Sequence, residues 1–219
     1  MLYVCVAFAI IAPYLICSVN PAIIVARIKS GTDIRGQGSG NPGLTNTLRT
    51  QGVAAAAAVL LFDVLKGVVS IMLTRLMFYY ALGTDVFERG NALSYAGWLS
   101  MLMAVVGHIF PVYYGFKGGK SVLVTVSALF VIDWVSALTL LMLFIFIVMI
   151  TRYVSLGSII AASALPVCLY VMWGYVYKRP DAFTAVVFSS IIAVILIFKH
   201  KGNIYRLMDK KEKKIGARK

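Results

Sequence analysis

Apolar runs long enough to cross a membrane follow one another along nearly the whole chain and constrain its fold more than any other feature. A helix needs about 20 apolar residues to span the hydrocarbon core of a bilayer. Hydrophobic residues make up 61% of the sequence and charged residues 13%, whereas the apolar share of a soluble domain is normally below about half. We therefore expect an all-α integral membrane protein.

Seven membrane-spanning helices fit the apolar runs, over residues 2–26, 53–80, 93–107, 120–133, 134–150, 155–174 and 182–198. The third and fourth are short and flank a polar stretch, which indicates a loop that dips into the membrane. Asp133 and Trp134 could instead lie inside one span over 121–150, which would give six spans. We prefer seven, because a helix of about 30 residues overshoots a hydrocarbon core of about 30 Å unless it is strongly tilted.

The net charge of +13 concerns membrane orientation and anionic ligands, because the cations lie beside the spans. With seven spans, one side carries sixteen Lys or Arg residues and the other three, while Lys66 and Arg75 lie inside the second span. The positive-inside rule then places the N-terminus outside and the C-terminus in the cytoplasm. We see no basic module interleaved with aromatic residues, so nucleic acid is not an expected partner.

We expect a single transmembrane domain over residues 1–219, with 200–219 as a basic cytoplasmic tail. The end of this tail, DKKEKKIGARK, is interpreted as solvated and attached to anionic lipid, or simply as a disordered end. Cys5, Cys17 and Cys168 all lie in apolar runs and show no C-x-x-C spacing, so neither a disulfide framework nor a zinc site is expected.

The longest polar, glycine-rich stretch is GSGNPGLTNTLRTQG, from Gly38 to Gly52, between two apolar segments. Its glycines allow backbone conformations with positive φ, in which consecutive N–H groups converge on an anion. Ser, Asn, Thr and Arg side chains add further donors, so the expected ligand is a phosphate or a carboxylate. The alternative interpretation is a flexible connector rich in turn-forming residues.

Two further polar stretches, on the same predicted face, are GHIFPVYYGFKGGKS (Gly107 to Ser121) and KHKGNIYRLMDKKE (Lys199 to Glu212). With the first stretch and with DVLKG in the second span, they resemble the signature motifs of bacterial glycerol-3-phosphate acyltransferases of the PlsY family. The resemblance covers nearly the whole chain and the motifs occur in the family's order. The chain departs from the family's pattern at Leu44 (usually Ala), at Ser121 and Lys210 (usually Gly) and at Lys201 (usually Arg).

This resemblance implies an enzyme of the bacterial cell membrane, with its active site facing the cytoplasm. It would move a fatty acyl group from acyl-phosphate to glycerol 3-phosphate, giving lysophosphatidic acid and phosphate. The expected catalytic residues are Ser39, Arg49, His108 and Asn203. The expected phosphate-binding residues are Gly38, Gly40, Asn41, Asn46, Lys117, Gly118, Gly119, Lys120, His200 and Arg206.

The residue types suit two polyanionic substrates. Arg49 offers a planar fork for phosphate, whereas Lys117 and Lys120 act as point charges. The glycines between those two lysines are expected to form a backbone anion nest. His108 could orient or deprotonate the attacking hydroxyl, or could be a structural histidine bonded to the backbone.

Two pairs of residues have helical spacing. His200 and Asn203 are three residues apart, so on a helix they share a face and can reach one ligand. Asp63 and Lys66 have the same spacing within the second span, where each would cost about 3 kcal/mol unpaired. We therefore expect a buried structural ion pair.

Absent motifs narrow the alternatives. GGKS lacks the first glycine of a P-loop, neither histidine begins an H-x-x-x-x-D pattern, and no G-x-S-x-G elbow or carboxylate cluster for Mg²⁺ is present. No CoA, metal or other cofactor is therefore expected. A small membrane transporter for an organic phosphate anion is the alternative function, although alternating access requires a site near the membrane midplane. A non-catalytic lipid-binding scaffold is the third.

Overall fold

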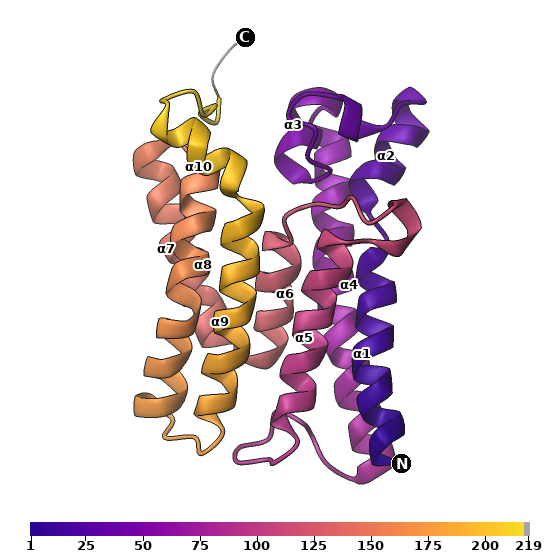
Figure 1. Ribbon diagram of the computed structural model, residues 1–219, viewed down its shortest axis with the longest axis vertical. Helices are drawn as coiled ribbons and strands as arrows, with labels where there is room; N and C mark the ends of the chain where they lie inside the picture. The colour runs from indigo at the N-terminus through magenta and orange to yellow at the C-terminus, as the bar shows by residue number, and fades with distance from the viewer. Residues whose placement is uncertain (217–219) are drawn as a thin grey trace.

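The computed structural model describes residues 1–216, and this part of the chain is helical and contains no strand. The long helices run side by side in one bundle (Figure 1). They are α1 (Leu2–Ser18), α4 (Val53–Leu82), α5 (Ser94–Ile109), α6 (Val122–Ile132), α7 (Trp134–Thr151), α8 (Val154–Leu169) and α9 (Ala182–Lys199). The short helices α2 (Pro21–Ser30), α3 (Leu44–Gln51) and α10 (Lys201–Met208) lie at the end opposite the N-terminus.

In the described part of the chain, six helical segments are long and apolar enough to cross a membrane: 2–30, 53–82, 94–114, 134–151, 154–176 and 182–199. The predicted fourth span corresponds to α6, whose 11 residues extend only about 16 Å at about 1.5 Å per residue. The predicted break at Asp133 is confirmed, because this residue is extended and its carboxylate accepts hydrogen bonds from the first N–H groups of α7. The chain is an integral membrane protein, with six full-length helical segments and one shorter apolar helix within residues 1–216.

The first predicted span is not one straight helix. Pro21 lacks the N–H group that a continuing helix would need, and Asn20 caps α2 by accepting a hydrogen bond from the N–H of Ile23 (3.1 Å). Between α1 and α2, Val19 is extended and its carbonyl group faces the bundle interior. An Asn-Pro pair within an apolar run is the signal for this break.

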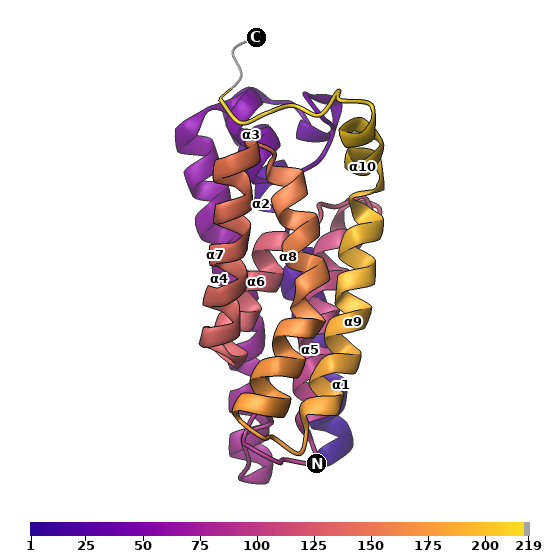
Figure 2. The same ribbon diagram turned by 90° about the vertical axis from the view of Figure 1, so that its left-hand side faces the viewer.

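Two further expectations differ from the structure. The glycine-rich stretch 38–52 is a loop only as far as Gly43, because residues 44–51 form α3, which packs on α2 and α4. The end of the tail is largely exposed over residues 209–216, as expected, but it does not extend freely, because it crosses the end of the bundle from α10 toward α3 (Figure 2). The N–H of Ile215 donates to the carbonyl of Arg152 (2.8 Å), which fixes this crossing. Residues 217–219 lie outside the described part of the chain.

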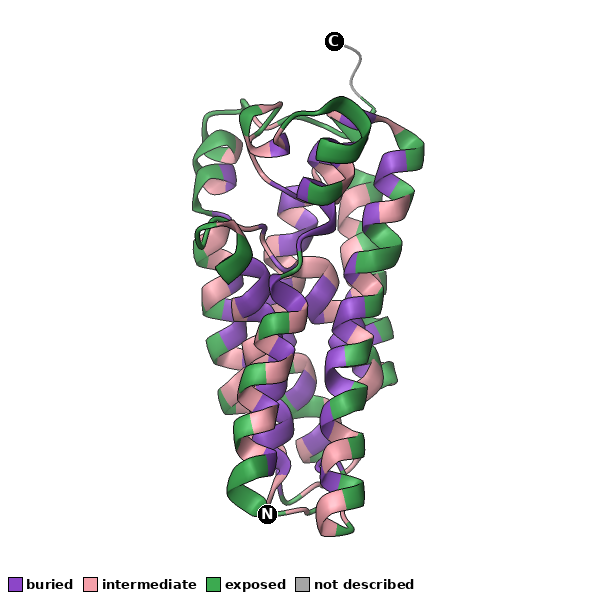
Figure 3. Ribbon diagram, turned by 90° about the vertical axis from the view of Figure 1, so that its right-hand side faces the viewer, coloured by how far each residue is buried: buried purple, intermediate pink, exposed green. Residues whose placement is uncertain are grey.

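The buried side chains lie along the inside of the bundle, and the outer faces of the long helices are exposed (Figure 3). Trp98, Trp173 and Phe78 are the largest buried side chains. Many large apolar residues are exposed on the outer faces of α4, α7 and α9, as expected of helices that face lipid rather than water.

Candidate active site

Three segments meet near the polar end of the bundle: the first loop (residues 31–43), the second loop (110–121) and α10 with the tail (200–216). Figure 1 shows the second loop at a level below α2 and α3, closer to the middle of the bundle. The guanidinium of Arg35 donates to the backbone carbonyls of Tyr114 (2.8 Å) and Lys117 (3.3 Å), which ties the first two loops together. Its guanidinium also forms an ion pair with Asp33 (2.7 Å). Arg35 was not among the predicted site residues, because its partners in the second loop are backbone carbonyls, which the sequence pattern does not reveal.

The second loop is tied to α10 through a chain of polar contacts. The ammonium group of Lys120 donates to Oδ1 of Asn203, and Nδ2 of Asn203 donates to Oε1 of Glu212 (2.7 Å). Nε of Arg206 donates to the other oxygen of the same carboxylate (2.7 Å). Three predicted residues are thereby brought together, with Glu212 orienting two of them. Glu212 is a residue that the sequence analysis missed, although it ends the third signature motif.

Several cations lie near Lys120. Burial lowers the pKa of Lys120 to about 8, with Glu212 opposing this shift and Arg206, Lys199 and Arg49 adding to it. Burial, together with the charge of Lys120, also lowers the pKa of His200 to about 4. At neutral pH the site therefore holds a neutral His200 among cationic side chains.

Arg49 lies at the exposed end of α3, where its Nη2 donates to the backbone carbonyl of Lys213 in the tail (3.3 Å). A hollow of about 260 Å³ separates α3 from the tail, and its lining is formed by Thr45, Leu48, Arg49, Lys214, Ile215 and Gly216. Within residues 1–216, the side chains of Ser39, Asn41 and Lys117 form no hydrogen bond to another predicted site residue, although the backbone of Ser39 bonds to Asn46.

Asn46 supports the first loop from within, because both polar atoms of its side chain bond to backbone groups of that loop. Its role in phosphate binding stays a prediction. Its Oδ1 accepts the N–H of Ser39 (2.9 Å) and its Nδ2 donates to the carbonyl of Gln37 (3.0 Å). Gly38 and Gly40 both have positive φ, as the sequence analysis expected of this loop. A Cβ atom on Gly38 would lie 2.3 Å from Oδ1 of Asn46, so glycine is also required there for space.

The predicted backbone nest at Gly118 and Gly119 is wrong in its geometry. The N–H of Gly118 donates to the carbonyl of Ile109 and that of Gly119 to the carbonyl of His108, each at 3.1 Å. Both N–H groups therefore bond to carbonyl groups at the C-terminal end of α5 and are not free to bind an anion. Neither glycine has positive φ. A Cβ atom on Gly119 would lie 2.3 Å from Nε2 of His108 and 2.9 Å from the carbonyl oxygen of Pro42. These glycines allow the second loop to pass close to His108 and to the first loop.

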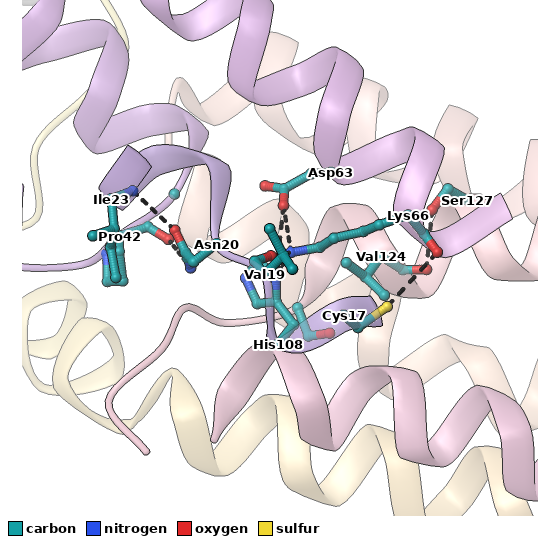
Figure 4. Close-up of polar contacts among 12 residues, drawn as sticks. Cys17, Val19, Asn20, Ile23, Pro42, Asp63, Lys66, His108, Val124 and Ser127 are labelled. Carbon is teal, nitrogen blue, oxygen red and sulfur yellow. Dashed lines mark hydrogen bonds and ion pairs between the residues drawn. The ribbon is translucent and has the colours of Figure 1, made fainter. Parts of the chain in front are cut away.

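The buried Asp63–Lys66 ion pair that the sequence predicts is present, with Nζ 2.9 Å from Oδ1 (Figure 4). Nζ of Lys66 also donates to the carbonyl of Val19 (2.8 Å) and lies 2.9 Å from Nδ1 of His108. The two α4 residues thus connect the break between α1 and α2 to the imidazole at the end of α5.

A mainly apolar groove lies between α6, α7, α8 and α9, with a cavity volume of about 100 Å³. Val122 and Thr125 line it, only two and five residues after Lys120. The groove therefore begins close in sequence to the cationic site. Among residues 1–216, no three His, Cys, Asp or Glu side chains are grouped as metal ligands.

Comparison with known proteins shows the family of the chain. Residues 7–210 match the family model described as glycerol-3-phosphate acyltransferase. The chain belongs to this family. A glycerol-3-phosphate acyltransferase from Shewanella sp. (strain MR-4) is 39% identical over 210 residues, covering 96% of this chain and 93% of the relative. One from Francisella tularensis subsp. tularensis (strain FSC 198) is 38% identical over 207 residues, covering 94% and 91%.

Two crystal structures of the acyltransferase PlsY, an integral membrane protein, have the same fold. Its glycerol 3-phosphate form superposes with a TM-score of 0.79 at 29% identity and covers 96% of each chain. Its lysophosphatidic acid form gives a TM-score of 0.76 at 28% identity, covering 96% of this chain and 95% of the other. The family resemblance inferred from the sequence motifs is confirmed.

Proposed function

We propose that this member of the acyltransferase family transfers a fatty acyl group from acyl-phosphate to glycerol 3-phosphate, giving lysophosphatidic acid and inorganic phosphate. The observation that carries this proposal is the convergence of Lys120, Asn203 and Arg206 beside an apolar groove. Both substrates carry phosphate, which suits cations, and one carries an alkyl chain, which suits the groove. The forms of the solved relative, with glycerol 3-phosphate and with lysophosphatidic acid, support the acceptor and the product.

The chemistry requires little from the protein beyond positioning and charge stabilisation. The primary hydroxyl oxygen of glycerol 3-phosphate attacks the acyl carbonyl carbon, the bond between that carbon and the phosphate oxygen breaks, and phosphate leaves with the electron pair. The hydroxyl proton passes to the leaving phosphate or to another acceptor. Acyl-phosphate is already an activated mixed anhydride, so the reaction needs neither CoA nor a resident metal. Holding the two anions in position and stabilising the carbonyl oxyanion are the main contributions.

Each cation has a suitable role in this reaction. Arg206 and Lys120 lie on α10 and on the second loop, so they can approach one bound phosphate from two sides. Arg49, on α3, is close enough to influence Lys120 and would hold a phosphate by its planar fork. The exposed Ser39 hydroxyl is available to a ligand oxygen. The acyl chain would lie in the groove between α6 and α9, within a bacterial cytoplasmic membrane.

Donor choice tests this proposal most sharply. Purified protein in detergent should release phosphate from acyl-phosphate only when glycerol 3-phosphate is present, and should do so in excess EDTA. Acyl-CoA of the same chain length should not replace the acyl-phosphate. Efficient turnover with acyl-CoA would show that the donor is wrong, whereas phosphate binding without turnover would favour a transporter or a scaffold.

A further inference from the structure

The ammonium group of Lys66 is surrounded by three acceptors that come from three different parts of the chain. It donates to the carbonyl of Val19, which the break after α1 leaves without a helical partner (2.8 Å). It lies 2.9 Å from Oδ1 of Asp63, in an ion pair whose atoms are not in line for a hydrogen bond. Its third neighbour is Nδ1 of His108 at 2.9 Å (Figure 4).

The charge state of this cluster follows from its composition. Asp63 is only 2% exposed and Lys66 only 7%, and the two charges neutralise each other. Removing the proton from Lys66 would leave a buried carboxylate without its cation, which is strongly unfavourable. Lys66 is therefore an ammonium group, which carries donors only.

An ammonium donor 2.9 Å from Nδ1 decides which ring nitrogen of His108 carries hydrogen. Two N–H donors cannot face each other at that distance, so Nδ1 accepts and carries no hydrogen. The other possible acceptor for an Nδ1–H group, Oδ1 of Asp63, is 3.6 Å away, which is too far for a hydrogen bond. A neutral imidazole without hydrogen on Nδ1 carries it on Nε2.

We propose that Lys66 is a positioning residue that holds His108 in the Nε2–H tautomer, so that this imidazole is a fixed hydrogen-bond donor and not a general base. Nε2 lies beside Gly119 and close to Pro42, where the first and second loops meet. From this place it donates to an anionic oxygen of a bound substrate, either a phosphate oxygen or the carbonyl oxygen as charge develops on it. This role deepens the proposed acyl transfer and rests on it.

His200 has the opposite arrangement and supplies an internal comparison. Its Nδ1 lies 2.8 Å from the carbonyl oxygen of Leu196, which can only accept, so Nδ1 carries the hydrogen. Its Nε2 then has a free lone pair, which suits the hydroxyl group of the acceptor better than a phosphate dianion. At Nε2, the imidazole of His108 is thus a hydrogen-bond donor and that of His200 an acceptor.

The tautomers can be observed directly, because the chain contains only two histidines. Nitrogen NMR of the full-length protein in detergent, labelled with ¹⁵N only in histidine, should show the protonated-type shift at Nε2 of His108 and at Nδ1 of His200. His200→Gln assigns the resonances. Hydrogen on Nδ1 of His108, or rapid exchange between its two tautomers, would overturn the proposal.

A pair of variants separates the positioning role from a purely structural one. Asp63→Leu with Lys66→Met removes both charges, so that neither is left buried alone. The fixed Nε2–H signal of His108 should then be lost and kcat should fall about 10- to 100-fold, as when an orienting partner of a functional histidine is removed. Lys66→Arg, which keeps a cationic donor, should retain the signal.

Thr74→Val, at another buried polar position of α4, is the control and should change neither the signal nor kcat. An unchanged His108 signal in the folded double variant would show that Lys66 does not set the tautomer. If the protein turns over acyl-phosphate but His108 carries its hydrogen on Nδ1, this inference is wrong and the proposed function stands. If both histidines have the expected tautomers but the protein does not turn over acyl-phosphate, the proposed function is wrong. The role of His108 as a donor to substrate is then wrong too, and only the assignment of its tautomer stands.

Discussion

At Gly119 the second loop passes close to both His108 and the first loop. The position leaves no room for a side chain, since a Cβ atom would lie 2.3 Å from Nε2 of His108 and 2.9 Å from the Pro42 carbonyl oxygen. Real Cβ atoms essentially never make such contacts, so either the imidazole or the first loop would have to move. The glycine preserves the relative positions of the groups that are proposed to contact substrate.

Gly119→Ala should therefore lower kcat/KM by about 100-fold or more, because displacement of catalytic groups by about 1 Å can have that effect. Gly36→Ala is the matched control, since Gly36 lies in the first loop and a methyl group there would meet no atom within 4 Å. Steady-state kinetics of both variants against each substrate would check this. Equal activity of the two variants would contradict the close approach at Gly119.

Lys120 links activity to pH. Its pKa is lowered to about 8 by burial and by neighbouring cations, so its charge is present below that pH and is lost as the pH rises through it. Loss of the charge weakens binding of a phosphate dianion. We expect kcat/KM for at least one substrate to fall above about pH 8, and Lys120→Arg to move this fall to higher pH, because guanidinium stays charged. A profile that is flat to about pH 9 in the unmodified enzyme would contradict the assignment.

The contacts of individual residues could be predicted where both partners lie close together in the sequence. The Asp63–Lys66 pair follows from two buried charges three residues apart, and the structure confirms it. The roles of Asn46 and Glu212 could not be derived in this way, because each depends on a partner that only the folded loops bring near. The catalytic and phosphate-binding assignments stay predictions.

At the scale of helices, two residues that depart from the family's motifs, Ser121 before α6 and Lys210 after α10, have left-handed backbone conformations. Ser121, which makes no side-chain capping hydrogen bond, has a φ of 64°, and Lys210 has a φ of 56°. The signature motifs that the sequence resembles have glycine at both positions. Left-handed backbone costs a non-glycine residue about 1–2 kcal/mol, so this chain retains the loop conformation with a residue that resists it.

Ser121→Gly should stabilise the protein by about 1 kcal/mol and raise its Tm by about 2–4 °C. Ser163→Gly is the control: Ser163 is an exposed residue within α8, and glycine there should destabilise by about 0.5–1 kcal/mol. Thermal unfolding in detergent would compare the two. A lower Tm for Ser121→Gly than for the unmodified protein would contradict this account of the loop.

Helix positions were predicted well where apolar length alone decides them, as for α4, α7 and α9. The breaks at Val19 and Asp133 depend on capping, and only the second was expected. The short helix α3 was missed because its sequence is polar. The fixed course of residues 209–216 was missed because its long-range hydrogen bonds use the backbone of Lys213 and Ile215, which the sequence pattern does not reveal.

For the whole molecule, charge separates the two ends of the bundle. The N-terminus and the loop between α4 and α5 lie at one end, whereas α2, α3 and α10 lie at the other (Figure 1). The end with α10 carries most of the cations, and the positive-inside rule assigns it to the cytoplasm. The orientation itself stays a prediction.

Cysteine labelling in intact cells would check this orientation. With Cys5, Cys17 and Cys168 replaced by Ala, a membrane-impermeant maleimide should label Arg89→Cys, in the α4–α5 loop, without permeabilisation. Thr32→Cys, in the first loop, should be labelled only after the cells are opened. The reverse pattern would place the active site outside and contradict the proposed use of cytoplasmic substrates.

The central claim is that one site joins an acyl group to glycerol 3-phosphate at the expense of acyl-phosphate. The most direct measurement is quantitative mass spectrometry of purified protein supplied with these two compounds alone, together with the phosphate released. We predict one monoacyl glycerol 3-phosphate for each phosphate, and neither product when glycerol 3-phosphate is omitted. Phosphate release without the acyl ester, or no reaction by folded protein, would contradict the account.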